Sequence, residues 1–503
     1  MPLRAGRLGL VWGSRSTGTK GTSEVKLSHR LQATSPRFDD PNLVSFAGLV
    51  PVLALAERAG LRELADQHLT VPTDRGANAG LKVSSLVAGM IAGADSIDDM
   101  ALLRHGGMGR IFHSNYAPST LGSFLRSFTF GHIRQLDAVA SRFLIALAGF
   151  ARLFTGTAES DALDGVVSAK GYALLDVDDT LIEVHGYAKQ GAGFGYTRVR
   201  GINALLATLS TTDAAPVIVA QRLRKGACNS SRGAKRLVAD AVKTTRRLLG
   251  PSRRVLVRMD SAYYGRGPVH AALAGAAAVS VTVRMNNPIR AAIVSLAEES
   301  WTPIEYTNAV FDEDSGAWIS RAEVTEIGFT AFAAQRKADH VTGRLVVRRI
   351  PDLNAEQHRA AGQDTLFDTW RFHAFFTTAD PQLLDTIAAD KTHRGHAIIE
   401  QVHADLKASA LAHLPSGVFT ANAAWLVLAV IAFNLTRASG VLTCTDLARA
   451  TTATVRRKLI QLPARSASRG RRLILHLPHA WPWRTAWSDL FNRLANPPPH
   501  AVS

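Results

Sequence analysis

The stretch GYALLDVDDTLIEVHG, residues 171–186, decides the fold class of this chain. Apolar and acidic residues alternate in its centre, so a strand would place Asp176 and Asp178 on one face and Val177 on the other. Two carboxylates on one strand face repel each other unless a proton or a cation lies between them. The stretch therefore predicts a strand that carries a metal site.

Strand-like and helical patterns alternate after this stretch. Segments 195–213 and 216–226 are again strand-like and follow with short connections, which favours an antiparallel meander. The next predicted elements are a basic helix at 232–250, a strand at 253–261, a helix at 265–276 and a strand at 278–285. Strand, strand, strand, helix, strand, helix, strand is the order of the RNase H-like fold.

The patterns on either side of this core predict the other parts of an α/β protein. Apolar residues at helical spacing between 45 and 150 predict an all-helical N-terminal domain, in which Ser119 would cap a short helix of a helix-turn-helix element. Strand-like pieces between 290 and 380 predict an inserted β-rich subdomain. The parts that we expect are a disordered basic tail at 1–40, a helical DNA-binding domain at 41–160, the first part of an RNase H-like catalytic core at 161–290, the β-rich insertion at 291–380, the helical part of the core at 381–440 and a basic C-terminal segment at 441–503.

The composition indicates a folded protein with a polyanionic partner. The chain has 503 residues, of which 47% are hydrophobic, and it carries a formal net charge of +17. Nucleic acid is the commonest polyanionic partner of a basic protein, although net charge alone also fits an unrelated basic enzyme. Charge therefore indicates the partner and leaves the chemistry open.

The cysteines and the apolar runs indicate the compartment. Cys228 and Cys444 are far apart, which excludes a disulfide framework and a cysteine zinc knuckle and fits a reducing compartment. The longest apolar run, at 423–433, is shorter than the about 20 residues that cross a bilayer, so it predicts a buried helix. We therefore expect a cytoplasmic, nucleoid-associated protein that binds no membrane.

Two further acidic residues stand out by their context. Asp260 ends the apolar strand VLVRM, and active sites of open sheets gather at the carboxyl ends of such strands. The alternative is that Asp260 caps the next helix. Glu400 lies in THRGHAIIEQVHADLK, residues 392–407, which we expect to form one helix. Seven residues are nearly two turns, so Glu400 and Lys407 would share a stripe that His393 and His396 extend.

The order of these motifs resembles DDE transposases of bacterial insertion sequences. In the cut-and-paste subgroup the signature is Tyr-x-x-Arg-x-x-x-Glu-x-x-x-x-x-x-Lys, and His393, His396, Glu400 and Lys407 hold its spacings, with His in place of both Tyr and Arg. The first motif of the family is commonly Asp-x-Thr, which Asp178 matches and which favours Asp178 over Asp176. The similarity runs from about residue 30 to about residue 480.

This resemblance implies a metal-dependent endonuclease that carries out DNA transposition and recombination for a transposable element. Asp178, Asp260 and Glu400 would be the catalytic residues and the ligands of two Mg²⁺ or Mn²⁺ ions. The partners would be double-stranded DNA, as terminal inverted repeats and as target, and a second copy of the chain in a homodimer. The side chains expected to bind DNA are Arg222, Arg224, Lys225, Lys235, Arg236, Arg246, Arg247, His393, Arg394, His396 and Lys407.

Two alternatives stay open at this stage. The string DVDDT also fits the Asp-x-Asp-x-Thr motif of haloacid-dehalogenase-like phosphatases, with Asp176 as nucleophile and Asp178 as acid or base. The two His substitutions in the signature also fit a DNA-binding relic without catalytic activity.

Overall fold

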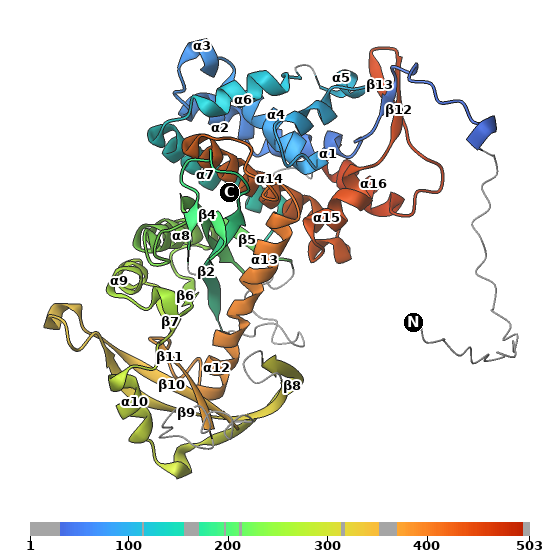
Figure 1. Cartoon of the computed structure of the whole chain (residues 1–503). Helices are drawn as coiled ribbons and strands as arrows, with labels where there is room; N and C mark the ends of the chain where they lie inside the picture. Colours follow the sequence, from blue (N-terminus) through green and yellow to red (C-terminus); the bar gives the residue numbers. More distant parts are fainter. Residues whose placement is uncertain are drawn as a thin grey trace, which may run out of the picture. The chain divides into compact units, whose positions relative to one another are not determined.

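The residues that the computed structural model describes are 31–112, 115–154, 171–195, 198–210, 214–312, 317–351 and 370–495 (Figure 1). Contacts divide the chain into Met1–Pro41 and one compact unit, Asn42–Ser503. The first unit has a short described helix, η1 (Leu31–Ala33), and most of the tail expected at 1–40 lies outside the described residues.

Helices make up most of the described chain between residues 42 and 154. They are α1 (Leu49–Arg58), α2 (Leu61–His68), α3 (Thr73–Gly76), α4 (Ala79–Ala92), η2 (Asp98–Leu103), α5 (Met108–Ile111), α6 (Pro118–Arg126) and α7 (Phe130–Ala151). The predicted cap at Ser119 is wrong, because α6 begins at Pro118, one residue earlier. Proline has the helical φ already and no N–H to satisfy, so it suits the first position of a helix without a side-chain cap.

Ten strands in the described residues join into one sheet. Its first six are β2 (Tyr172–Glu183), β3 (Gly193–Phe194), β4 (Arg200–Leu209), β5 (Val217–Lys225), β6 (Arg254–Met259) and β7 (Ala278–Thr282). β4 pairs antiparallel with both β2 and β5, whereas β2, β6 and β7 run parallel. The predicted meander and the predicted order of strands and helices in this region are confirmed.

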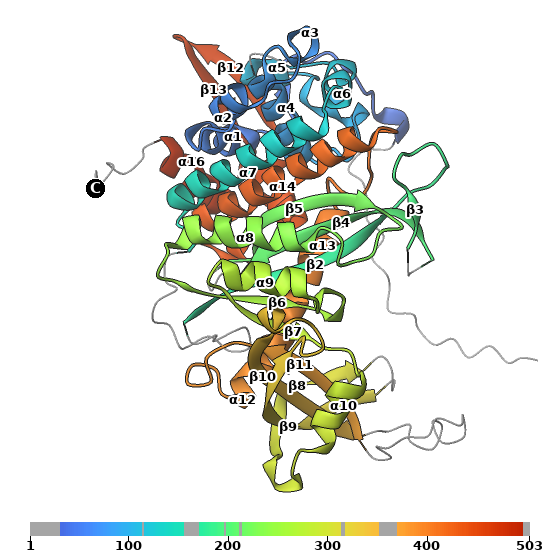
Figure 2. The same ribbon diagram turned by 90° about the vertical axis from the view of Figure 1, so that its left-hand side faces the viewer.

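Helices cover both faces of this sheet. Leu175 and Val177 of β2 belong to the main apolar core together with residues of α8 (Ala234–Leu249) and α9 (Arg266–Ala274), which Figure 2 shows in front of the strands. The alternate residue Leu174 packs in a second cluster with Ala389 of α12 (Thr386–Arg394). Asp176 and Asp178 therefore point to the side of α12 and of the helix that follows it.

The inserted strands continue the same sheet. They are β8 (Thr302–Asp312), β9 (Ala317–Ala331), β10 (Val341–Pro351) and β11 (Trp370–Thr377), and a helix, α10 (Asn287–Val294), and two short turns, η4 (Glu298–Ser300) and η5 (Lys337–Asp339), accompany them. β11 pairs antiparallel with β7, so that Phe376 lies opposite Val281. The β-rich insertion thus extends the sheet of the core, in the order β7-β11-β10-β9-β8.

The predicted continuous helix at 392–407 is wrong. α12 ends at Arg394, a single 3-10 turn, η6 (Gly395–Ala397), follows, and α13 (Ile398–Lys407) begins after it. The tighter turn changes the angular spacing between residues before and after it, so the two histidines and Glu400 do not form one stripe.

α14 (Phe419–Leu442) is the central helix of the fold, and it packs against α4, α7 and β5. Among the described helices it is the one that is long and apolar enough to span a membrane, but 89% of its most apolar window is buried inside the protein. The apolar run at 423–433 is therefore part of a buried helix, as predicted, and that helix is about twice as long as the run.

The C-terminal part is folded against the N-terminal helices. It contains η7 (Asp446–Ala448), α15 (Thr452–Val455), a π-helical turn η8 (Arg456–Ile460), β12 (Ala464–Arg469), β13 (Arg472–His476) and α16 (Arg484–Ala495). β12 pairs with β1 (Leu43–Val44), which ties the two ends of the compact unit together.

Candidate active site

Asp178 and Asp260 lie at neighbouring positions of two adjacent parallel strands. Val177 of β2 and Met259 of β6 are the last paired residues of these strands, and the two aspartates follow them directly. Adjacent strands are about 4.7–4.9 Å apart, so the two carboxylates leave the backbone close enough together to share a pair of metal ions.

The surroundings of this pair disfavour two negative charges. Burial raises the pKa of Asp178 to about 7, and the negative charges of Asp260 and Asp179 contribute to the increase. Burial also raises the pKa of Asp260, although one of its oxygens accepts a hydrogen bond of 2.9 Å from the Ala262 N–H. That bond caps η3 (Ser261–Tyr263), so Asp260 has the capping role considered above and still faces Asp178. A cation would relieve the repulsion.

Asp176, the neighbour of Asp178 on the same strand face, is fully enclosed. Arg258 donates to both of its oxygens, at 2.7 and 2.8 Å, and His396 Nδ1 lies 2.9 Å from Oδ1. Burial raises the pKa of Asp176, but Arg258 and His396 outweigh burial and hold this pKa below its usual value. A carboxylate bound in this way is a poor nucleophile, which disfavours the phosphatase alternative.

Asp179 forms a second closed network beside the pair. Its oxygens accept from Arg224 at 2.7 Å and from the Tyr263 hydroxyl at 2.6 Å, and Asn203 is a third donor. Burial and the charge of Asp179 raise the pKa of Tyr263, so this phenol stays protonated and keeps donating. Both oxygens of Asp179 are thus engaged by protein donors, and the residue fixes the wall of the site.

Helix α13 faces the pair with a histidine and presents Glu400 to solvent. His403 is buried, and its Nδ1 lies 3.9 Å from Oδ2 of Asp178. Burial lowers the pKa of His403 to about 4, so the ring is neutral at pH 7. Glu400, one turn before His403, is exposed, and no ion pair or hydrogen bond of its carboxylate occurs within the described residues.

His393 takes no part in this site. Its ring lies between the hydroxyls of Ser280 and Thr282, at 2.8 and 2.9 Å, and stacks on Phe375 with the ring centroids 4.1 Å apart. Burial lowers its pKa well below the usual value. The position that holds Tyr in the signature is therefore a neutral structural contact between α12 and the sheet.

The comparisons with known proteins agree with this geometry. Residues 29–499 match the family described as "Transposase DDE domain group 1". The chain belongs to this family. No curated protein sequence matches the chain.

Residues of this DDE transposase fit a divalent metal only in part. Two carboxylates with raised pKa values, Asp178 and Asp260, are hard oxygen ligands of the type that Mg²⁺ and Mn²⁺ prefer. Across the part of the chain that the structure describes, no three His, Cys, Asp or Glu side chains are grouped closely enough to hold an ion. Glu400 is exposed and would have to turn toward the pair to complete the set.

The cationic residues expected to bind DNA occupy three kinds of position in this transposase. Arg224 is 6% exposed and is bound to Asp179, and Arg246 donates to backbone carbonyls at the end of α8, such as that of Pro251 at 2.7 Å. The side chains engaged with nearby carboxylates at the surface or in the interior are Arg222, Arg236, Arg394 and His396. The exposed ones are Lys225, Lys235, Arg247 and Lys407.

Three residues that shape the site of the transposase were not predicted. They are Arg258, Asp179 and Tyr263. The sequence carries a signal for the first, because an arginine in the middle of the apolar strand VLVRM needs a buried acidic partner. For the other two, the partners come from elements far apart in sequence, and no local pattern reveals them.

Proposed function

We propose that this transposase cleaves DNA at the ends of an insertion sequence and joins them to target DNA, with Asp178, Asp260 and Glu400 as ligands of two Mg²⁺ or Mn²⁺ ions. The observation that carries the proposal is the placement of Asp178 next to Asp260 where β6 ends, with the pKa of both carboxyls raised. The antiparallel β5-β4-β2 meander followed by parallel β6 and β7 supports an RNase H-like core.

The three acids approach the ions from two sides in this mechanism. Asp178 and Asp260 would hold the ions from the sheet, and Glu400 would complete the ligand set from α13. When bound, the ions supply an activated water and neutralise charge on the attacking and leaving oxygens of the phosphodiester. The neutral ring of His403 packs beside Asp178 without adding a positive charge that would compete for the carboxylate.

The partners follow from the family and the charge. A net charge of +17 and exposed cations such as Lys225 and Lys407 favour contact with DNA phosphates, and synapsis of two transposon ends would require two copies of the chain. Glu400 lies at the surface, where bound DNA would reach it and remove it from solvent.

Cleavage of DNA that carries the terminal inverted repeats tests this function. The full-length protein should nick these ends with Mg²⁺ or Mn²⁺ and should not do so in EDTA. Asp178→Asn, Asp260→Asn and Glu400→Gln should each abolish nicking, while the exposed controls Asp74→Asn and Glu299→Gln should retain it. Nicking that persists in EDTA, or in all three active-site variants, would contradict the proposal. No nicking by the wild-type protein in any metal would support the inactive relic instead.

A further inference from the structure

A cavity of about 280 Å³ lies between α7, α8 and β5, away from the candidate active site. Leu237 of α8 lines it, and α8 covers the sheet face opposite to the one that carries Asp178. Two further hollows, of about 40 and 320 Å³, share lining residues with it or with each other and continue along β5 past Phe130 to Arg232. We call the three together the β5 groove.

Cationic side chains outnumber carboxylates in the main cavity. Its two carboxylates are Asp137 and Asp240, and its cations are Arg134, Arg142, Arg236, Lys243 and Arg247. The lining therefore has an excess of three positive charges when both carboxylates are ionised. Burial raises the pKa of Asp137 to about 6, although Arg134 opposes this, so the excess can only increase on mild acidification.

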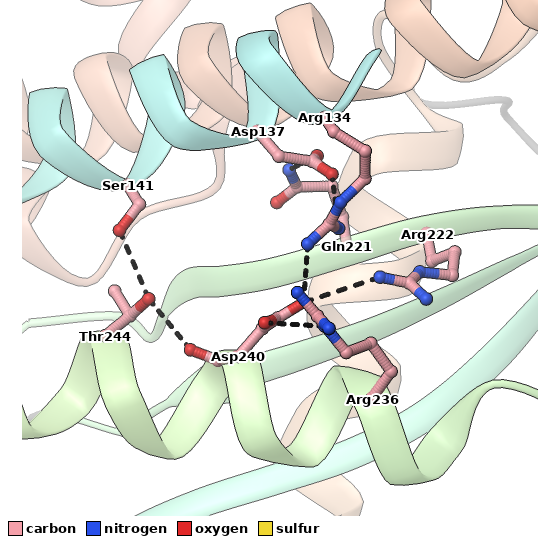
Figure 3. A network of polar contacts seen from close by, with 8 residues as sticks. All are labelled: Arg134, Asp137, Ser141, Gln221, Arg222, Arg236, Asp240 and Thr244. Atoms are coloured by element: carbon pink, nitrogen blue, oxygen red, sulfur yellow. Dashed lines mark hydrogen bonds and ion pairs between the residues drawn. The ribbon is translucent and has the colours of Figure 1, made fainter. Parts of the chain in front are cut away.

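Three guanidinium groups converge on one carboxylate in this cavity. Arg134, Arg222 and Arg236 lie 3.1, 3.4 and 3.1 Å from the oxygens of Asp240, and Figure 3 shows them arriving from α7, from β5 and from α8. Asp137 accepts from Gln221 at 2.9 Å and from Arg134. The acids thus hold the arginines in position, and these contacts use only some of the five N–H donors of each guanidinium.

Two cations in the same cavity are not neutralised. Lys243 and Arg247 are exposed on α8, one turn apart, and within the described residues neither side chain forms a hydrogen bond or an ion pair. A lysine ammonium beside an arginine guanidinium is a combination that binds phosphate oxygens. Apolar side chains, among them Leu144, Ile218 and Val430, also line the cavity.

We propose that this cavity binds a nucleotide phosphate outside the candidate active site, with Lys243 and Arg247 as the primary contacts. A volume of about 280 Å³ is slightly below the about 300–1,000 Å³ that small-molecule sites have, so it suits at most one nucleotide-sized unit, with its phosphate on the cations and its apolar part against the apolar lining. The source of the phosphate is either a free nucleotide or a DNA strand.

The continuation of the groove favours a DNA strand. Lys225 and Arg232 line its far end, and the ring of Phe130, which is 70% exposed, stands beside them. Cations along a groove together with an exposed aromatic ring are the features that hold a single strand through its phosphates and one stacked base. Only this choice of source rests on the proposed function, because the cavity itself does not depend on the catalytic acids.

Binding to pyrophosphate and to a short oligothymidylate single strand, both in EDTA, tests the site. For Lys243→Met/Arg247→Met we expect at least about tenfold weaker binding, which corresponds to about 1.4 kcal/mol. The matched control Lys337→Met/Arg104→Met removes one exposed lysine and one exposed arginine outside the groove and should bind as the wild type does. If pyrophosphate and the oligonucleotide both lose affinity in the first variant, free phosphate ligands use the site. A loss with the oligonucleotide alone identifies a DNA strand.

The site is ruled out if neither probe binds to the wild-type protein, or if the double variant binds both probes like its control. Asp240→Asn is a second test, with the opposite effect expected: it removes the carboxylate that binds three arginines, so each probe that uses the site should bind more tightly. Unchanged or weaker binding by a folded Asp240→Asn protein would also contradict the proposal. Cleavage is not involved in these measurements, so loss of the transposase activity in Asp178→Asn and loss of phosphate binding in Lys243→Met/Arg247→Met are separate outcomes.

Discussion

Arg258 and Asp176 face each other at paired positions of β6 and β2, with both side chains completely buried and two hydrogen bonds of 2.7 and 2.8 Å between them. The pair stands two residues before the two candidate metal ligands on the same strands. Arg258 also donates to the Thr392 carbonyl at the end of α12, so one guanidinium joins two strands and a helix directly beneath the site.

Removal of the arginine from this pair should destabilise the fold. Arg258→Met leaves the Asp176 carboxylate buried without its main partner, and we expect a loss of about 3–5 kcal/mol in the free energy of unfolding, measured with urea. Arg254→Met, at the exposed start of the same strand, is the matched control and should unfold like the wild type. The variant Asp176→Leu/Arg258→Met should recover much of the loss, because no buried charge remains. Equal urea midpoints for Arg258→Met and the wild type would contradict this assignment.

The raised pKa of Asp178 predicts that the free energy of unfolding of the metal-free protein decreases as the pH rises. In the unfolded chain this carboxyl ionises near 3.8, but in the folded chain it keeps its proton up to about pH 7. Between these values the unfolded state binds fewer protons, so the free energy of unfolding falls as the pH rises, by at most about 1.4 kcal/mol per pH unit. Asp178→Asn removes this loss.

Urea unfolding in EDTA measures this effect. The stability advantage of Asp178→Asn over the wild type should be small near pH 4 and should grow until about pH 7. Asp74→Asn, at a side chain that is 72% exposed, should show no such growth. An advantage that stays constant across this range would show that Asp178 ionises normally.

Neutralisation of two acids on α13 should have different effects: it should lower stability at Asp405 and cleavage at Glu400. Asp405 is buried and accepts from Arg437 at 2.6 Å and from the backbone N–H of Thr452 at 2.9 Å, so Asp405→Asn should cost about 3–5 kcal/mol of stability. Glu400 is exposed, and Glu400→Gln should leave stability unchanged but reduce cleavage of transposon ends by at least about 100-fold, as loss of a metal ligand or its orientation does. If Asp405→Asn loses cleavage without losing stability, the third ligand has been assigned to the wrong residue.

Variants of two neighbouring cations on β5, Arg224 and Lys225, should also differ, one in stability and the other in DNA binding. Arg224 is bound to Asp179 in the interior, whereas Lys225 is exposed. Lys225→Met should reduce the slope of log affinity against log salt by about 1 without changing stability. Arg224→Met should instead lower the free energy of unfolding by about 3–5 kcal/mol, because Asp179 would keep its charge and lose its partner. A normal melting temperature for Arg224→Met, together with weaker DNA binding, would restore the role that the sequence suggested.

Local patterns predicted the core elements well. The alternation around Asp178, the apolar strand before Asp260 and the basic helix ending at Gly250 each depend on short-range periodicity, and all three elements form as expected. The adjacency of the two aspartates depends on the parallel pairing of β2 with β6, which the order of elements along the chain does not state by itself.

Features decided by distant contacts were not predictable in this way. The 3-10 turn at Gly395–Ala397 lets His396 contact Asp176 while His393 packs against β7, and neither partner is near in sequence. The edge strand β8 has no regular alternation that would fix its bounds, because polar residues interrupt its pattern, TPIEYTNAVFD. The burial of Arg224 could not be predicted either, because it depends on Asp179, 45 residues earlier.

The position of α14 in the centre of the fold determines when the chain can fold during its synthesis. Asn434 of this helix bonds both the N–H and the carbonyl of Ile218 on β5, across 216 residues of sequence. A ribosome that adds about 5–20 residues per second needs roughly 10–40 s to make that interval. During this time the apolar side chains of α7 and β5 that pack against α14 have no partner, so these three elements can complete their packing only after α14 has been made.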